Sequence, residues 1–143
     1  MLHKELTGQI IKSFYKVYNG LGYGFLEKVY ENALQAELQK AGFKCVTQYP
    51  IEVYYNQQLV GEYFADLVVE RKVILELKSA DTLNRAHELQ LINYLKATNI
   101  KIGLLLNFGK KPQFRRKIFT IMISEYQQNL CHPRSILIRY YNL

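Results

Sequence analysis

Residues 59–79 read LVGEYFADLVVERKVILELKS and contain two predicted strands, 59–69 and 73–79. Both segments are rich in β-branched, aromatic and alternating residues, which are typical of strands. Only the polar residues 70–72 separate them, and such a short connector indicates an antiparallel hairpin. If the hairpin is centred on Arg71, Asp66 lies directly opposite Glu76.

The segments around this hairpin follow helical and strand periods in turn. Apolar residues three and four positions apart predict helices, and a stretch with three glycines, residues 19–24, separates the first two. Asp81 and Thr82 offer an N-cap for a third helix. The predicted helices cover residues 6–21, 25–41 and 83–98, and the further strands cover residues 45–55, 101–107 and 135–141.

The order of these elements predicts the fold class. After the first helix, the chain runs helix, three strands, helix, strand, and the short connectors make the three strands an antiparallel meander. A helix between two strands most simply makes a right-handed crossover to a parallel neighbour. We therefore expect an α/β fold with a mixed sheet flanked by helices. A chain of 143 residues fits a single domain, 1–143.

Composition excludes some classes of protein. Apolar residues make up 49% of the chain, but no stretch approaches the ~20 apolar residues of a membrane-spanning helix. Residues 1–5 lack a secretory signal pattern, so we expect the mature chain to begin at Met1. Cys45 and Cys131 lack metal-ligand spacing and fit a reducing cytoplasm. The net charge of +7 favours a polyanionic partner such as nucleic acid, although ordinary solubility explains it equally well.

The predicted strand 73–79 contains candidate catalytic residues. Alternation places Ile74, Glu76 and Lys78 on one face, so an acid and a base lie side by side. One interpretation is an ion pair at the rim of the sheet. Asp66 favours another, because paired residues have Cβ atoms roughly 5 Å apart and two bare carboxylates would repel each other. A divalent cation between Asp66 and Glu76 removes this repulsion, and carboxylate oxygens suit Mg²⁺ or Mn²⁺.

These parts predict phosphodiester hydrolysis. A metal held by Asp66 and Glu76 would polarise a phosphoryl oxygen and activate water, while Lys78 would hold the water or the developing negative charge. The prediction depends on the strand register, because a slip of one residue would turn Asp66 to the other face.

The same residues resemble a known family. Asp66, followed after nine residues by Glu76-Leu77-Lys78, is similar to the motif of the PD-(D/E)xK nuclease superfamily, and residues 24–30, GFLEKVY, resemble the signature of its GxxExxY branch. Four further blocks are similar to that family in the same order, namely residues 61–69, 74–78, 90–98 and 103–109. The resemblance spans about residues 5–119 and leaves residues 120–143 as an extension of unknown role. The chain departs from the family at Phe64, where members often carry a basic residue.

The resemblance implies a restriction-endonuclease-like core, αβββαβ, with a Mg²⁺- or Mn²⁺-dependent site. It implies that Glu27 is a further metal-binding acid, and that Gln90 and Tyr94 lie at the edge of the site. Glu27 shares a predicted helix face with Tyr30, although an exposed surface glutamate is the alternative. His87 lies on the same helix face as Gln90 and is more simply a structural histidine than a base.

A basic run near the end of the predicted core is a candidate nucleic-acid-binding segment. Its cations could follow a phosphate backbone and Phe114 could stack on a base, but a solvated strand end is an equal alternative. The cations are Lys110, Lys111, Arg115, Arg116 and Lys117.

The leading hypothesis is a metal-dependent nuclease acting on DNA or RNA through Glu27, Asp66, Glu76 and Lys78. The alternative is a catalytically silent nuclease-fold module that binds nucleic acid or takes part in an assembly. A partner-regulated subunit is a third possibility, and an exposed sheet edge makes a homodimer reasonable.

Overall fold

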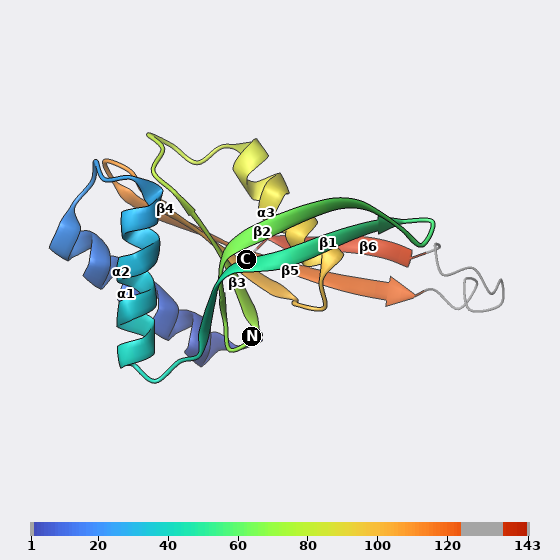
Figure 1. Cartoon of the computed structure of the whole chain (residues 1–143), viewed down its shortest axis with the longest axis horizontal. Helices are drawn as coiled ribbons and strands as arrows, with labels where there is room; N and C mark the ends of the chain where they lie inside the picture. Colours follow the sequence, from blue (N-terminus) through green and yellow to red (C-terminus); the bar gives the residue numbers. More distant parts are fainter. Residues whose placement is uncertain (1, 124–135, 143) are drawn as a thin grey trace.

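The computed structural model describes residues 2–123 and 136–142 (Figure 1). The helices are α1 (Lys4–Leu21), α2 (Glu27–Lys40) and α3 (Arg85–Ala97). The strands are β1 (Cys45–Tyr55), β2 (Gln58–Val69), β3 (Val73–Lys78), β4 (Ile102–Phe108), β5 (Pro112–Ile123) and β6 (Ile136–Asn142). None of the described helices combines the length and the apolar character needed to cross a membrane.

The strands of the described residues form one mixed sheet in the order β1-β2-β3-β4-β5-β6. Strands β3 and β4 are parallel and are connected through α3, whereas the other neighbours are antiparallel. The predicted α/β class and the mixed sheet flanked by helices are therefore confirmed. Residues 112–117 of the basic segment, for which the sequence predicted no element, form the first half of β5.

The β2–β3 hairpin has the predicted register. Leu67 pairs with Leu75 and Val69 with Val73, which centres the turn on Arg71. Glu70 and Arg71 both adopt left-handed backbone conformations, and the amide of Lys72 donates to the carbonyl of Val69 at 2.9 Å. This is a type I′ turn, whose twist suits a tight hairpin.

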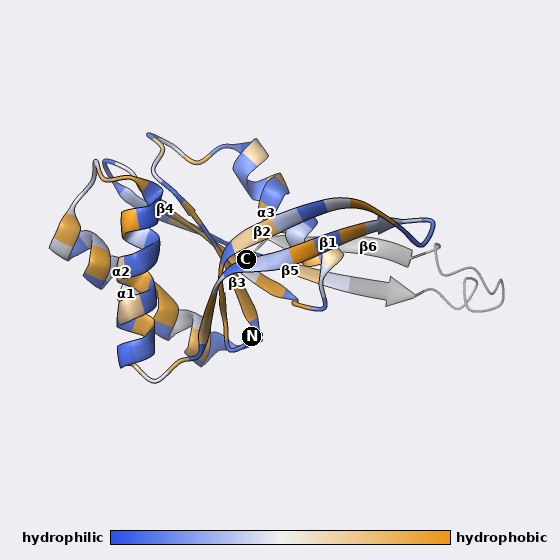
Figure 2. Cartoon of the chain, viewed as in Figure 1, coloured by the Kyte–Doolittle hydropathy of each residue, from blue (hydrophilic) through white to orange (hydrophobic). Residues whose placement is uncertain are grey.

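Helices cover both faces of the sheet. Helices α1 and α2 pack on one face through residues such as Phe14 and Leu34, which join a cluster with Leu75 and Leu77 of β3. Helix α3 packs on the opposite face, where Leu91 meets Ile74 of β3 in a second cluster. Strand β4 is buried along its whole length, as its apolar sequence predicts. Hydrophobic residues also recur along β1 and β2 out to a hydrophilic turn (Figure 2).

Helix α3 begins later than the sequence predicted, and its cap is Asn84 instead of Asp81 or Thr82. The Asn84 side chain accepts a hydrogen bond from the His87 amide at 3.1 Å, and His87 Nδ1 accepts one from the Asn84 amide at 3.3 Å. These reciprocal bonds satisfy two backbone donors at the helix start, as a capping box does. His87 therefore has the structural role of a capping residue.

Candidate active site

Strands β2 and β3 part where the acidic residues begin. Backbone pairing of these strands extends to Leu67 and Leu75, and Asp66 and Glu76 are the next residues on each strand. Side chains replace the backbone acceptors here, because the Asp66 amide donates to Glu76 Oε1 at 3.2 Å and the Leu77 amide donates to Asp66 Oδ2 at 2.8 Å. The two carboxyl groups are therefore held in one gap at the point where the strands diverge.

Burial and mutual repulsion make this carboxyl pair reluctant to ionise. Glu76 is only 3% exposed, and desolvation, followed by the charge of Asp66, raises its pKa to about 8. Burial also raises the pKa of Asp66, against the opposing effect of the hydrogen bond from Leu77. Lys78 acts in the opposite direction and lowers the pKa of both acids. A bound cation would relieve the repulsion by stabilising both ionised forms.

Lys78 is held beside the acids by helix α3. Its Nζ donates to Gln90 Oε1 at 2.9 Å, and Gln90 Nε2 donates to the hydroxyl of Tyr94 at 3.1 Å. The ammonium is thus bonded to Gln90, and among the described residues it forms no ion pair with Glu76, so the simple rim ion pair is not what the strand contains. Burial, followed by the charge of Glu76, raises the pKa of Tyr94, so Tyr94 lies within electrostatic range of the acids.

Helix α2 brings two further acids near Asp66. Glu27 is exposed in the first turn of α2, whereas Glu31 is only 4% exposed. Both raise the pKa of Asp66, and Glu31 has the larger effect. The sequence analysis identified Glu27 and missed Glu31. The signal for Glu31 was its spacing of three and seven residues from Leu34 and Leu38, which places it on the buried face of the helix.

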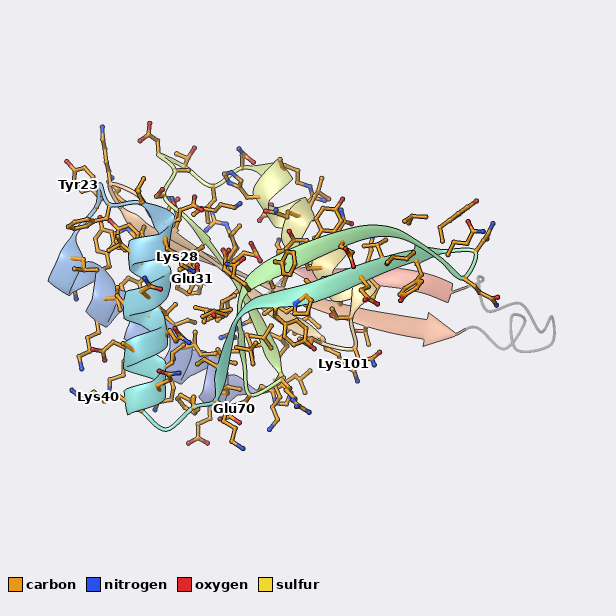
Figure 3. All side chains as sticks on the ribbon, viewed as in Figure 1. Tyr23, Lys28, Glu31, Lys40, Glu70 and Lys101 are labelled. Atoms are coloured by element: carbon orange, nitrogen blue, oxygen red, sulfur yellow. The ribbon has the colours of Figure 1, made fainter. Side chains whose placement is uncertain are left out.

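Glu31 is held by neighbours on two elements. Gln48 Nε2 on β1 donates to Glu31 Oε1 at 3.2 Å and to Oε2 at 3.4 Å, and Lys28 Nζ lies 3.4 Å from Oε1. Lys28 and Glu31 lie next to each other on α2 (Figure 3). Gln48 has a left-handed backbone with φ of 50°, an uncommon conformation for a residue other than glycine. Because its neighbours pair with Leu67 and Ala65, Gln48 stands opposite Asp66.

Comparison with models of protein families identifies the family of this chain. A model of the PD-(D/E)XK nuclease superfamily matches residues 4–117, most of the chain, including every residue described above for the site. This chain belongs to the PD-(D/E)XK nuclease superfamily. No curated protein matches it.

A solved structure titled "Crystal structure of SSO0001" shares the fold of this PD-(D/E)XK chain. The TM-score is 0.51 and the sequence identity is 15% over 62% of this chain. The match covers 48% of that chain, so this protein spans about half its length. At this level of identity the likeness concerns the fold alone.

The PD-(D/E)XK residues fit a hard divalent cation, although not as a complete cage. Among residues 2–123, no three His, Cys, Asp or Glu side chains lie close enough together to hold a metal ion. Glu27, which lies exposed at the start of α2, therefore does not form a preformed three-acid group with Asp66 and Glu76. The Asp66–Glu76 pair still suits Mg²⁺, which commonly binds through one or two carboxylates and keeps several waters.

Asn107 and Gly109 position the backbone that follows the PD-(D/E)XK lysine. Asn107 is fully buried, and its side chain makes two hydrogen bonds to the backbone of Ala80, at 2.9 Å to the amide and 2.8 Å to the carbonyl. A Cβ on Gly109 would stand 2.1 Å from the Ala80 carbonyl oxygen, so only glycine fits there. The sequence analysis missed both residues. The signal for Asn107 was a polar side chain in an otherwise apolar strand.

The basic run does not form one continuous surface. Alternation along β5 sends neighbouring side chains to opposite faces of the sheet. Lys117 is buried and pairs with Glu88 of α3 at 3.1 Å, and Arg115 lies 3.9 Å from the same residue, whereas Arg116 donates to Thr7 of α1 at 2.8 Å. The predicted track of five cations is thus divided, and Lys110 and Lys111 are its exposed members before β5.

Phe114 is likewise turned to the protein. Its half-buried ring packs edge-on against Tyr15 of α1, with ring centroids 6.4 Å apart. A base that stacked on Phe114 would have to displace this contact.

Proposed function

We propose that this chain is a Mg²⁺- or Mn²⁺-dependent nuclease that hydrolyses phosphodiester bonds in DNA or RNA. The observation that carries the proposal is the desolvated Asp66–Glu76 carboxyl pair with the Lys78 ammonium beside it. A buried pair of acids that repel each other destabilises the fold, and a bound cation would remove this destabilisation.

Each side chain then has a role. Asp66 and Glu76 hold the metal ion, which when bound polarises a phosphoryl oxygen and lowers the pKa of water. Glu27 and Glu31 add negative charge around Asp66 and increase the attraction for a divalent cation. Lys78 stabilises negative charge that develops on the phosphate. Gln90 orients the ammonium of Lys78, and Tyr94 orients Gln90.

The same proposal includes a branch of the superfamily, the contacts for nucleic acid and the state of the protein in the cell. The segment GFLEKVY at residues 24–30 supports membership of the GxxExxY branch, because it supplies both Glu27 and the buried Tyr30. Tyr30 donates to the carbonyl of Gly22 at 2.7 Å and accepts from the Phe25 amide at 3.2 Å, which ties the glycine-rich loop to α2. The exposed Lys110 and Lys111 are proposed contacts for the nucleic acid. A single domain, a cytoplasmic location and a homodimer complete the proposal.

The test is a cleavage assay on the purified full chain. Supercoiled plasmid, single-stranded DNA and RNA are incubated with Mg²⁺, Mn²⁺ or EDTA. Cleavage is expected with at least one of the two metals and should stop in EDTA, because the Asp66–Glu76 pair binds substrate phosphate only through a cation. A chain that binds nucleic acid with steep salt dependence but cuts none of the three would instead be a silent binding or assembly module.

A second prediction concerns the acids of helix α2. Glu27→Gln and Glu31→Gln should each raise the Mn²⁺ concentration for half-maximal cleavage by about tenfold, since groups around metal ligands typically contribute ten- to a hundredfold to affinity. Glu37→Gln is the matched control on the same helix, because Glu37 pairs with Lys16 at 3.1 Å, away from Asp66. Metal titrations that coincide for all three variants would exclude α2 from the metal site.

A further inference from the structure

A groove runs between helix α3 and the β1–β2 hairpin, and it adjoins the candidate active site through Gln90 and Tyr94. Its volume is about 800 Å³, within the range of roughly 300–1,000 Å³ typical of pockets for small organic ligands. Gln90 and Tyr94 line it, and they are the residues that hold Lys78 in place. A ligand in this groove would therefore lie one side chain, Gln90, away from the Lys78 ammonium. Figure 1 shows the hairpin extending past α3.

The walls of the groove are aromatic and apolar. Tyr63 on β2 is 51% exposed, and its ring is tilted against that of Tyr94, with ring centroids 5.8 Å apart. Tyr54 and Leu89 also line the groove and are 59% and 42% exposed. Asn93 supplies an exposed side-chain amide, which can both donate and accept. Flat exposed rings beside an amide suit a flat heteroaromatic ligand with polar edges.

The charges of the groove argue against a phosphate track. Of the lining residues, Glu52 is acidic and Lys96 is basic, so the walls carry no net positive charge. Glu52 accepts a hydrogen bond from the hydroxyl of Tyr54 at 2.6 Å, which places its carboxylate along the same wall. A duplex is held mainly through phosphate contacts to Lys and Arg, and its bases are stacked inside. An unpaired base can enter the groove without the cost of unstacking.

We infer that the groove binds an unpaired nucleobase of single-stranded nucleic acid, with the neighbouring phosphodiester at Asp66, Glu76 and Lys78. This inference rests on the proposed function, and it specifies the substrate class of that site. Tyr63 is the stacking platform and Asn93 contacts the edge of the base. Aromatic stacking tolerates any base, because every base has a flat π-face, so the site selects single strands without selecting sequence.

The experiment measures binding separately from cleavage. Labelled single-stranded DNA, single-stranded RNA and duplex DNA of one sequence are titrated with the full chain in EDTA, so that no cutting occurs and binding of the base in the groove is measured without the metal-dependent phosphate contact. The variants are Tyr63→Ala, Tyr63→Phe and the control Tyr55→Ala, which changes a neighbouring exposed tyrosine outside the groove lining. Fluorescence of an oligonucleotide that carries 2-aminopurine reports stacking directly.

Single strands of at least one kind should bind about tenfold more tightly than the duplex. Tyr63→Ala should remove that difference and restore the 2-aminopurine fluorescence, whereas Tyr63→Phe and Tyr55→Ala should preserve both. Equal affinity for single strand and duplex, or the same affinity in Tyr63→Ala and Tyr55→Ala, overturns the inference. If metal-supplemented protein cuts duplex as fast as single strands, the nuclease proposal stands and the inference fails. Tyr63-dependent binding of single strands without any cleavage leaves the groove assignment in place and removes the nuclease proposal.

Discussion

Replacing Lys78 with alanine should reduce the rate of phosphodiester cleavage by roughly a hundred- to a thousandfold, the typical cost of removing one group that stabilises transition-state charge. Lys78 is bonded to Gln90 and is not locked in an ion pair with the acids. Its ammonium is therefore available to a negatively charged substrate at the cost of one hydrogen bond to a neutral amide. The measurement is the single-turnover cleavage rate at saturating metal.

Two comparisons separate this role from a structural one. Lys78→Ala should still be stabilised against thermal unfolding by Mn²⁺, because Asp66 and Glu76 remain. Lys72→Ala, which removes an exposed lysine at the β2–β3 turn, should cleave like the wild type. A Lys78→Ala protein that folds, binds Mn²⁺ and cuts within a few-fold of the wild-type rate would show that the ammonium has no part in the reaction.

Glu76 should make the metal-free protein less stable as pH rises from about 5 to 8. Its pKa is about 8 in the folded protein, against an ordinary value of 4.5. Below pH 4.5 the Glu76 carboxyl is protonated in both the folded and the unfolded state, so its ionisation does not change the free energy of unfolding. Between these two pKa values, folding keeps a proton that the unfolded chain releases, so the free energy of unfolding falls by about 1.4 kcal/mol per pH unit. Above pH 8 the full penalty remains.

The effect is measured as the difference in Tm between wild type and Glu76→Gln in EDTA. Glutamine cannot ionise, so the advantage of Glu76→Gln should grow steadily across this pH range. Adding Mn²⁺ at pH 8 should stabilise the wild type far more than the variant, since the cation stabilises the ionised pair. Glu62→Gln changes an exposed acid of β2 and should show no such trend. A constant difference in Tm between pH 5 and pH 8 would contradict the raised pKa.

The raised pKa of Glu76 links the stability of the folded protein to the proposed metal site. Under the proposed function, ionisation of Glu76 is costly in the metal-free protein and would become favourable on cation binding, so part of the binding free energy of the metal would offset the repulsion between Asp66 and Glu76. Protein stability and metal affinity would then be coupled through Glu76.

Much of the fold follows from local sequence. The bounds predicted for residues 45–55 match β1, and those for residues 59–69 match β2 to within one residue, because strand periodicity and polar turns define them. The pairing of Leu67 with Leu75 was also predictable, since a short connector allows few registers. The opposition of Asp66 and Glu76 depends on that register alone.

Tertiary packing sets the contacts between residues that are distant in sequence. Local sequence is enough to place an acid pair and a lysine at one point of a hairpin, because alternation and a tight turn are local properties. Packing decided that Glu31 is buried and held by Gln48, that Lys78 bonds to Gln90, and that β5 divides the basic run. Those contacts depend on how α2 and α3 lie against the sheet, and no local pattern of the sequence specifies the position of a helix on a sheet to within the length of a hydrogen bond.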